Sequence, residues 1–116
     1  MSNSQGHVCS GKTHNQVISS VYHDTYALQL KFGYIVVNNT GEGHVLPFFD
    51  KCWKNIIFYQ RVFVTENYKG QMQIFNYNYQ NVVPGFWSNV LVDEHCVVVE
   101  NMDGNIFLYD YEGNLM

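Results

Sequence analysis

The most chemically suggestive stretch of the chain lies near its start, where residues 6–13 read GHVCSGKT and fit the pattern G-x-x-x-x-G-K-[ST]. In a phosphate-binding loop of this kind, backbone N–H groups surround the phosphates, the lysine (here Lys12) reaches the outer phosphates, and the hydroxyl holds magnesium. A buried strand must deliver such a loop, and the preceding MSNSQ is too polar to be one. We therefore interpret the match as a coincidence, and nucleotide handling is the least favoured function.

Histidine and cysteine side chains give no recognisable metal site or catalytic pair. Four possible ligands lie in the first quarter of the chain, namely His7, Cys9, His14 and His23. None of them forms a pair with the tight spacing of structural zinc ligands. His95 and Cys96 are adjacent, but neighbouring residues on a strand point to opposite faces, so we predict that Cys96 belongs to the core.

Other enzyme motifs are missing as well. The sequence contains neither a Gly-x-Ser-x-Gly turn nor a His-Glu-x-x-His helix motif. The stretches after Asp103 and Asp110 carry oxygen ligands, but the twelve-residue calcium-loop pattern is absent, and turn chemistry accounts for both. The sequence therefore predicts a protein that is not an enzyme and that holds no metal or other cofactor.

The elements that must position any functional residue come from a sequence repeat. Residues 55–77 read NIIFYQRVFVTENYKGQMQIFNY and residues 89–111 read NVLVDEHCVVVENMDGNIFLYDY, with a constant offset of 34. A fixed period of this length is typical of repeat β architectures. The identical pairs are Asn55/Asn89, Val64/Val98, Glu66/Glu100, Asn67/Asn101, Gly70/Gly104 and Tyr77/Tyr111.

Each copy is predicted to be a β-hairpin, because runs rich in β-branched and aromatic residues flank Lys69-Gly70 and Asp103-Gly104. Two-residue type I′ turns at these dipeptides would fix the register of the strands. Both faces of each hairpin would then be fairly apolar, which indicates packing between neighbours. The expected cross-strand pairs are Val64 with Phe75, Val62 with Tyr77, Thr65 with Ile74, Val98 with Tyr109, Cys96 with Tyr111, and Val99 with Leu108.

A weaker copy lies upstream, where residues 33–49 match residues 70–86 at an offset of 37 and residues 27–32 would supply the partner strand. Apolar residues at 17, 18, 21, 22 and 26 suit a short helix over residues 15–26, although their β-branched side chains also suit a strand. The predicted fold is mainly β, with antiparallel hairpin repeats forming a propeller-like sheet stack, barrel or sandwich. We expect one domain over 1–116, with a flexible arm at 1–13 and repeat units at 27–49, 55–86 and 89–116.

Composition indicates the cellular compartment and the kinds of partner that the chain could have. Aromatic residues make up 16% of the chain and charged residues 14%, so aromatic surface must be buried or form an interface. No apolar run suits a signal peptide or a membrane span. The odd cysteine count favours a reduced, cytoplasmic setting. Residues 89–116 hold six acidic residues and no Lys or Arg, which argues against nucleic-acid binding by this part of the chain. The acidic residues would suit a basic partner. Alternatively, they would keep an edge strand from pairing with other molecules.

These features favour a binding module that docks a protein partner, as an inhibitor or immunity-type factor does. The candidate binding residues are Trp53, Phe86, Trp87, Asp93, Glu94, Asp103 and Glu112. The alternative is a small-ligand or carbohydrate binder in which Trp53 and Trp87 stack on sugar faces, although aromatics in such links more often seal one repeat on the next. Open sheet edges would also allow a homo-oligomer, because a closed propeller needs about four blades.

The units at 33–49, 70–86 and 104–116 resemble the WG-type β repeats of bacterial proteins. In those repeats a glycine opens a short apolar strand, Asp/Asn-x-x-Gly makes a turn, and an apolar pair and proline follow. The segments IFNYNYQNVVP and YDYEGNLM carry the similarity. The resemblance implies a propeller-like or solenoid β arrangement and a binding role.

Overall fold

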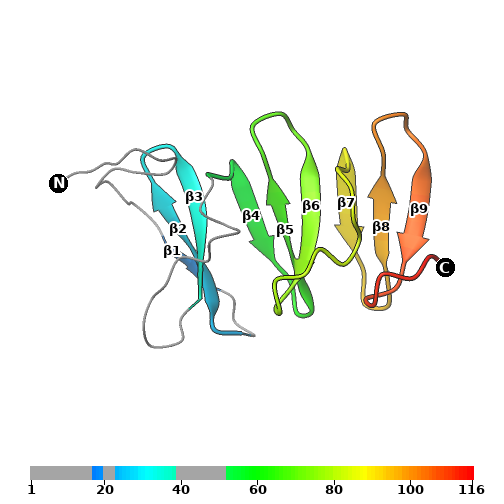
Figure 1. The fold of residues 1–116 in the computed structure, drawn as a ribbon, viewed down its shortest axis with the longest axis horizontal. Helices are drawn as coiled ribbons and strands as arrows, with labels where there is room; N and C mark the ends of the chain where they lie inside the picture. Colours follow the sequence, from blue (N-terminus) through cyan, green and yellow to red (C-terminus); the bar gives the residue numbers. More distant parts are fainter. Residues whose placement is uncertain (1–16, 20–22, 39–51) are drawn as a thin grey trace. The chain divides into compact units, whose positions relative to one another are not determined.

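The computed structural model describes residues 17–19, 23–38 and 52–116. Its contacts divide the chain into two compact units, Met1–Ile56 and Ile57–Met116. The described residues form three antiparallel sheets of three strands each, with orders β1-β2-β3, β4-β5-β6 and β7-β8-β9 (Figure 1). The prediction of a mainly β protein built from hairpins is thereby confirmed.

The first sheet contains β1 (Val17–Ser19), β2 (Thr25–Leu30) and β3 (Gly33–Asn38). Leu30 pairs with Gly33 across a two-residue turn, so the upstream hairpin is present as expected. The helix over residues 15–26 was wrong for the described part of that segment, because residues 17–19, 25 and 26 are in strands. Val17 and Ile18 are β-branched residues, which favour extended backbone, and their strand pairs with β2.

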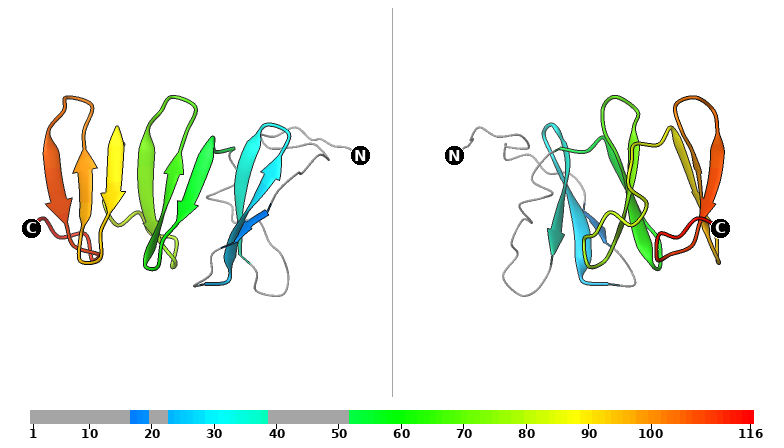
Figure 2. Two further views of the ribbon diagram at one scale, coloured as in Figure 1. Left: turned by 180° about the vertical axis from the view of Figure 1, so that it is seen from behind. Right: turned by 45° about the vertical axis from the view of Figure 1, so that its right-hand side comes forward.

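The two copies of the strong repeat form the other two sheets. The second sheet contains β4 (Asn55–Phe58), β5 (Val62–Glu66) and β6 (Met72–Asn76). The third, called the terminal sheet below, contains β7 (Asn89–Val92), β8 (Val97–Glu100) and β9 (Ile106–Tyr109). The β5–β6 and β8–β9 turns lie at the same end of their sheets in all ribbon views (Figure 2).

The register within these hairpins differs by one residue from the sequence prediction. Val64 pairs with Ile74 rather than Phe75, and Val98 pairs with Leu108 rather than Tyr109. The cause is the turn, which is a three-residue loop and not a two-residue type I′ turn. Such loops combine a type I turn with a left-handed residue, and Gly70 takes that position at φ 80°.

The side chain of Asn67 explains why the longer loop forms. Its Oδ1 accepts hydrogen bonds from the N–H groups of Lys69 (2.9 Å) and Gln71 (3.0 Å). Asn and Asp side chains commonly bond to backbone two residues on and so define a turn. The same arrangement recurs after Asn76, Asn101 and Asp110. Turn chemistry therefore accounts for the segments around Asp103 and Asp110, as predicted.

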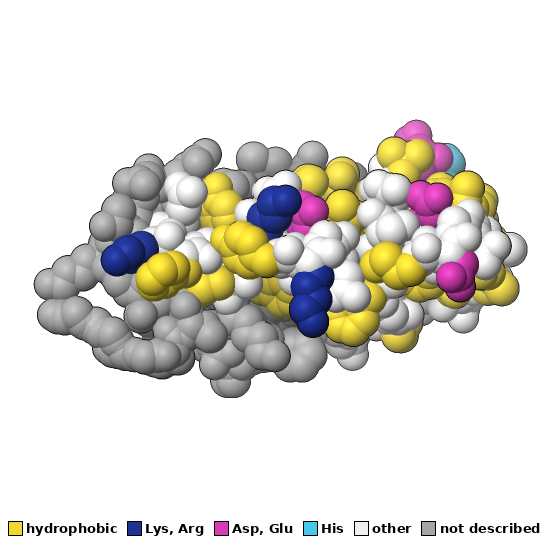
Figure 3. All heavy atoms as spheres, turned by 90° about the horizontal axis from the view of Figure 1, so that it is seen from above, with side chains coloured by type: hydrophobic (Ala, Val, Ile, Leu, Met, Phe, Trp, Pro, Cys, Tyr) yellow, Lys and Arg dark blue, Asp and Glu magenta, His cyan; other side chains and the backbone are white. Residues whose placement is uncertain are grey.

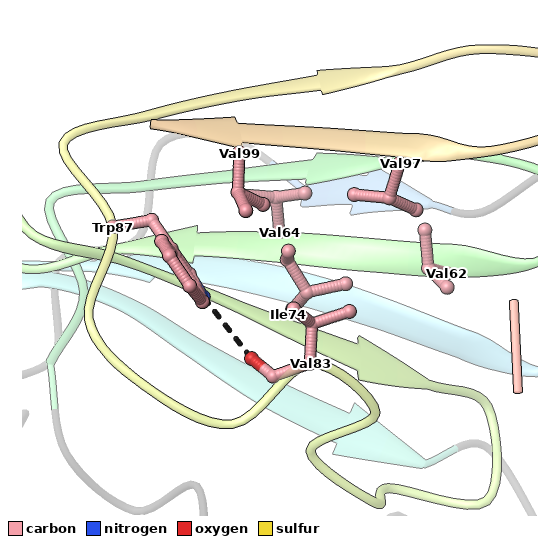
Figure 4. Close-up of a cluster of buried hydrophobic side chains, with 7 residues drawn as sticks. All are labelled: Val62, Val64, Ile74, Val83, Trp87, Val97 and Val99. Carbon is pink, nitrogen blue, oxygen red and sulfur yellow. Dashed lines mark hydrogen bonds between the residues drawn. The ribbon is translucent and has the colours of Figure 1, made fainter. Parts of the chain in front are cut away.

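The main core of the second unit lies between its two hairpins (Figure 4). Val62, Val64 and Ile74 point from β5 and β6 toward β8, which supplies side chains to the opposite side of the cluster. The link between the sheets closes one end, where the indole N–H of Trp87 donates to the carbonyl of Val83 at 3.1 Å. The remaining members of the cluster are Val97 and Val99. The two strong repeats are therefore equivalent hairpins that pack on each other.

Candidate protein-docking surface

Alternation along the strands gives the terminal sheet two distinct faces. The inner face, with Val97 and Val99 at its centre, packs into the core of the second unit. The opposite face, called the outer face, carries Leu91, Val98 and Leu108 in one row across β7, β8 and β9. A second row contains Asn89, Glu100 and Ile106.

The outer face is apolar and open. Leu91 is 64% exposed, Ile106 63% and Leu108 42%, although all three lie in regular strands. A shallow hollow of about 300 Å³ lies on the sheet here, with Leu91, Val98, Glu100 and Ile106 in its lining. Contiguous apolar patches of this kind mark interaction surfaces more often than do single exposed residues.

One polar contact orders the edge of this face. The amide of Asn89 donates through Nδ2 to Oε1 of Glu100 at 2.7 Å. The bond directs one carboxylate oxygen of Glu100 toward β7, within the row that also contains Ile106. The outer face therefore combines aliphatic side chains with a negative charge held at its border.

The predicted acidic residues are all exposed, but the structure places them in two groups. Asp93 and Glu94 lie in the β7–β8 turn, and Glu112 belongs to the same end because the hydroxyl of Tyr111 donates to the Asp93 carbonyl. Asp103 lies in the β8–β9 turn at the opposite end, near Glu100. Figure 3 shows acidic and hydrophobic side chains next to each other over the terminal sheet.

Two ionisable groups at the first of these ends have shifted pKa values. Hydrogen bonding from the backbone N–H of Asn114 holds the pKa of Asp110 below its usual value of 3.8. Burial raises the pKa of the Tyr111 hydroxyl, and the nearby guanidinium of Arg61 opposes that shift. Arg61 also lies 4.8 Å from the centre of the Tyr111 ring, so a cation–π contact joins the two repeats.

None of the three predicted aromatic residues, Trp53, Phe86 and Trp87, is part of the outer face. Trp53 and Trp87 are both buried, so neither ring is available to stack on a sugar. Their main chains instead bridge to the preceding sheets, Trp53 to Tyr34 and Trp87 to Met72. Phe86 is exposed but lies in the link before β7 and not on the outer face.

Sequence reasoning missed the residues that make the outer face, namely Leu91, Ile106 and Leu108. The signal was present, because β7 and β9 are apolar at successive positions and not only at alternate ones. That pattern indicated a hairpin covered on both sides. It did not show which side of which copy would be uncovered.

Other candidate chemistry gives no assembled site in the part of the chain that the structure describes. There, no three His, Cys, Asp or Glu side chains come together as metal ligands, and no helix is long and apolar enough to cross a membrane. Cys96 is buried with a free thiol, as expected of a core residue. Cys52 is disulfide-bonded. Residues 6–13 lie outside the described residues.

Comparisons of the chain with protein-family models, with curated proteins and with solved structures gave no match. The resemblance to WG-type repeats therefore stays a prediction.

Proposed function

We propose that the chain is a non-catalytic binding module that docks a protein partner, with an inhibitor or immunity-type role. The observation that carries the proposal is the outer face of the terminal sheet, where Leu91, Ile106 and Leu108 stand exposed from regular strands. Removing such side chains from water is favourable at roughly 25 cal/mol per Å² of apolar area. A protein surface of matching shape would supply that burial.

The charges around the face define the kind of partner. Residues 89–116 contain six acidic residues and no Lys or Arg, and Glu100 borders the apolar row itself. Complementary charges steer association and disfavour wrong partners. The partner should therefore carry Lys or Arg around an apolar contact area.

The proposal is tested by affinity capture from native lysate, followed by quantitative mass spectrometry. The wild-type chain is compared with a Leu91→Glu/Leu108→Glu double variant, which places charge on the outer face without changing the core. We expect the captured partner to be lost from the double variant. Tyr68→Glu is the matched control, because it changes an exposed aromatic residue in the turn of the second hairpin. Equal capture by all three proteins would refute docking at this face.

A further inference from the structure

Equivalent faces of the two strong repeats are buried to different extents. Val64 and Ile74 in the second sheet correspond, at the offset of 34, to Val98 and Leu108 in the terminal sheet. Val64 is 5% exposed and Ile74 is fully buried, whereas Leu108 is 42% exposed and Val98 is half-buried. The side chains are of the same kind and occupy the same rows. The difference is that another sheet covers the first pair.

What covers the first pair is known from the structure. It is the inner face of the next repeat, whose central residues are Val97 and Val99, with Phe107 and Tyr109 packed beside them. Trp87 lies just before that repeat in the chain, and its main chain forms two hydrogen bonds with the main chain of Met72, of 2.8 and 2.9 Å. The established interface is therefore a sheet-on-sheet contact between successive repeats.

The chain also reproduces the path that leads to such a contact. After β6, Asn81 bridges to Phe75 and the N–H of Val82 donates to the carbonyl of Ile74 at 3.2 Å. After β9, Leu115 bridges to Tyr109 and the N–H of Met116 donates to the carbonyl of Leu108 at 2.8 Å. Met116 thus occupies the position of Val82, one residue before Val83 enters the core.

We infer that the outer face of the terminal sheet is a docking surface for another antiparallel sheet of the same repeat type. The inference rests on the proposed function and names the occupant of that site. The partner's sheet presents branched aliphatic and aromatic residues in the manner of Val97, Val99 and Phe107, with Lys or Arg at its rim to match Glu100 and Asp103.

A second copy of this chain fits the surface less well. Among the described residues, the face of the required kind is already buried in the chain's own core, around Val97 and Val99. Two outer faces packed together would bring their borders of carboxylates near each other, because residues 89–116 contain no Lys or Arg to offset them. Like charges at an interface are unfavourable.

The test uses a tethered repeat as the probe. Residues 83–116 are duplicated and joined directly after Met116 of the full chain, which continues the period without a gap. We expect the added repeat to fold on the outer face, so that urea unfolding shifts to a higher midpoint with a larger m-value, because more surface is exposed on unfolding. An unchanged midpoint and m-value would overturn the inference.

The control carries Leu108→Glu in the original repeat, with and without the extension. Leu108→Glu should abolish the shift that the extension produces, because its charge would have to be buried under the added sheet. A shift that persists in this variant would show that the extension stabilises by another route, and would contradict the inference.

Two further measurements separate the outcomes. The unextended chain should sediment as a monomer at high concentration, and a dimer abolished by Leu91→Glu would show that a second copy is the occupant instead. The added repeat presents an outer face of its own, so the extended chain should still capture the partner, whereas Leu91→Glu and Leu108→Glu placed in the added repeat should abolish capture. If the extension does not stabilise the chain but capture still depends on Leu91 and Leu108, the proposed function stands and the repeat-type occupant is wrong. If capture is independent of both residues, the proposed function itself fails.

Discussion

At the scale of single residues, the glycines of the equivalent turns are required for different reasons. Gly70, Gly104 and Gly113 all have positive φ, near 80–88°, where a side chain costs about 1–2 kcal/mol. Gly70 has open space around it, but a Cβ on Gly113 would overlap the carbonyl oxygen of Val82. Gly113 therefore allows the last turn to lie directly against the link between the repeats.

Replacing these glycines should show that difference. We expect Gly70→Ala to lower the free energy of unfolding by about 1–2 kcal/mol, from backbone strain alone. Gly113→Ala should cost a further 1–3 kcal/mol or so, because the Val82 main chain must move to admit the methyl group. Urea denaturation of both variants measures the two effects, and equal losses would contradict the assigned contact.

A carboxylate in the last turn should make stability depend on pH in the acid range. Hydrogen bonding lowers the pKa of Asp110 in the folded state. Its contribution is therefore present above the ordinary pKa of 3.8 and is lost as the pH falls through the lower folded value. Asp110→Asn, which keeps the side-chain acceptor, should flatten this part of the profile. Thermal unfolding between about pH 5 and pH 2 tests it, with Asp103→Asn as the control for loss of an exposed carboxylate.

At the scale of elements, the repeated turns decide how the strands pair. A side-chain oxygen at the first position holds two backbone N–H groups, and this favours a three-residue loop over the two-residue turn that Asp103-Gly104 suggests. The register shifts by one residue as a consequence. Val98 then faces Leu108 across the sheet, which creates the apolar row of the outer face. A local hydrogen bond is thus responsible for the composition of a surface.

Removing that acceptor should loosen one hairpin. Asn101→Ala is expected to cost about 1–2 kcal/mol, because the N–H groups of Asp103 and Asn105 lose their partner. Hydrogen exchange at these two amides should become faster, while amides in β5 and β6 keep their protection. Asn105→Ala is the matched control, since it keeps both bonds to Asn101. Unchanged exchange in Asn101→Ala would show that the turn forms without its side chain.

At the scale of the whole molecule, the packing of repeat on repeat carries the stability of the second unit. Its core is built from both sheets and from the link, and Trp87 belongs to it. The indole therefore stabilises the join between repeats and does not present a ligand platform. Phe86, its neighbour in sequence, remains exposed.

The contrast between these neighbours is a direct test of that assignment. Trp87→Ala should lower the free energy of unfolding by roughly 3–5 kcal/mol, as loss of a large buried aromatic residue does. Phe86→Ala should change it by about 0.5 kcal/mol or less, because the ring contributes little buried area. Chemical denaturation followed by circular dichroism measures both. A Trp87→Ala protein of unchanged stability would reopen the carbohydrate-binding alternative.

The sequence by itself determined the class of the fold, the period of 34 and the positions of the hairpins, because alternation and turn residues act locally. It placed Cys96 in the core for the same reason. The register was missed by one residue, since Asp-Gly suggests one turn and the side chain of Asn101 selects another. The helix over residues 15–26 was wrong where described, because pairing with a neighbouring strand outweighed a helical spacing.

Only the tertiary structure decided which surface is open. Val64 and Val98, or Ile74 and Leu108, are nearly interchangeable as sequence, yet Val64 and Ile74 are buried, whereas Val98 is half-buried and Leu108 is exposed. Burial is a property of what packs on a residue and not of the residue itself. For that reason the repeat could be read from the amino acids, but the exposed face of its last copy could be found only in three dimensions.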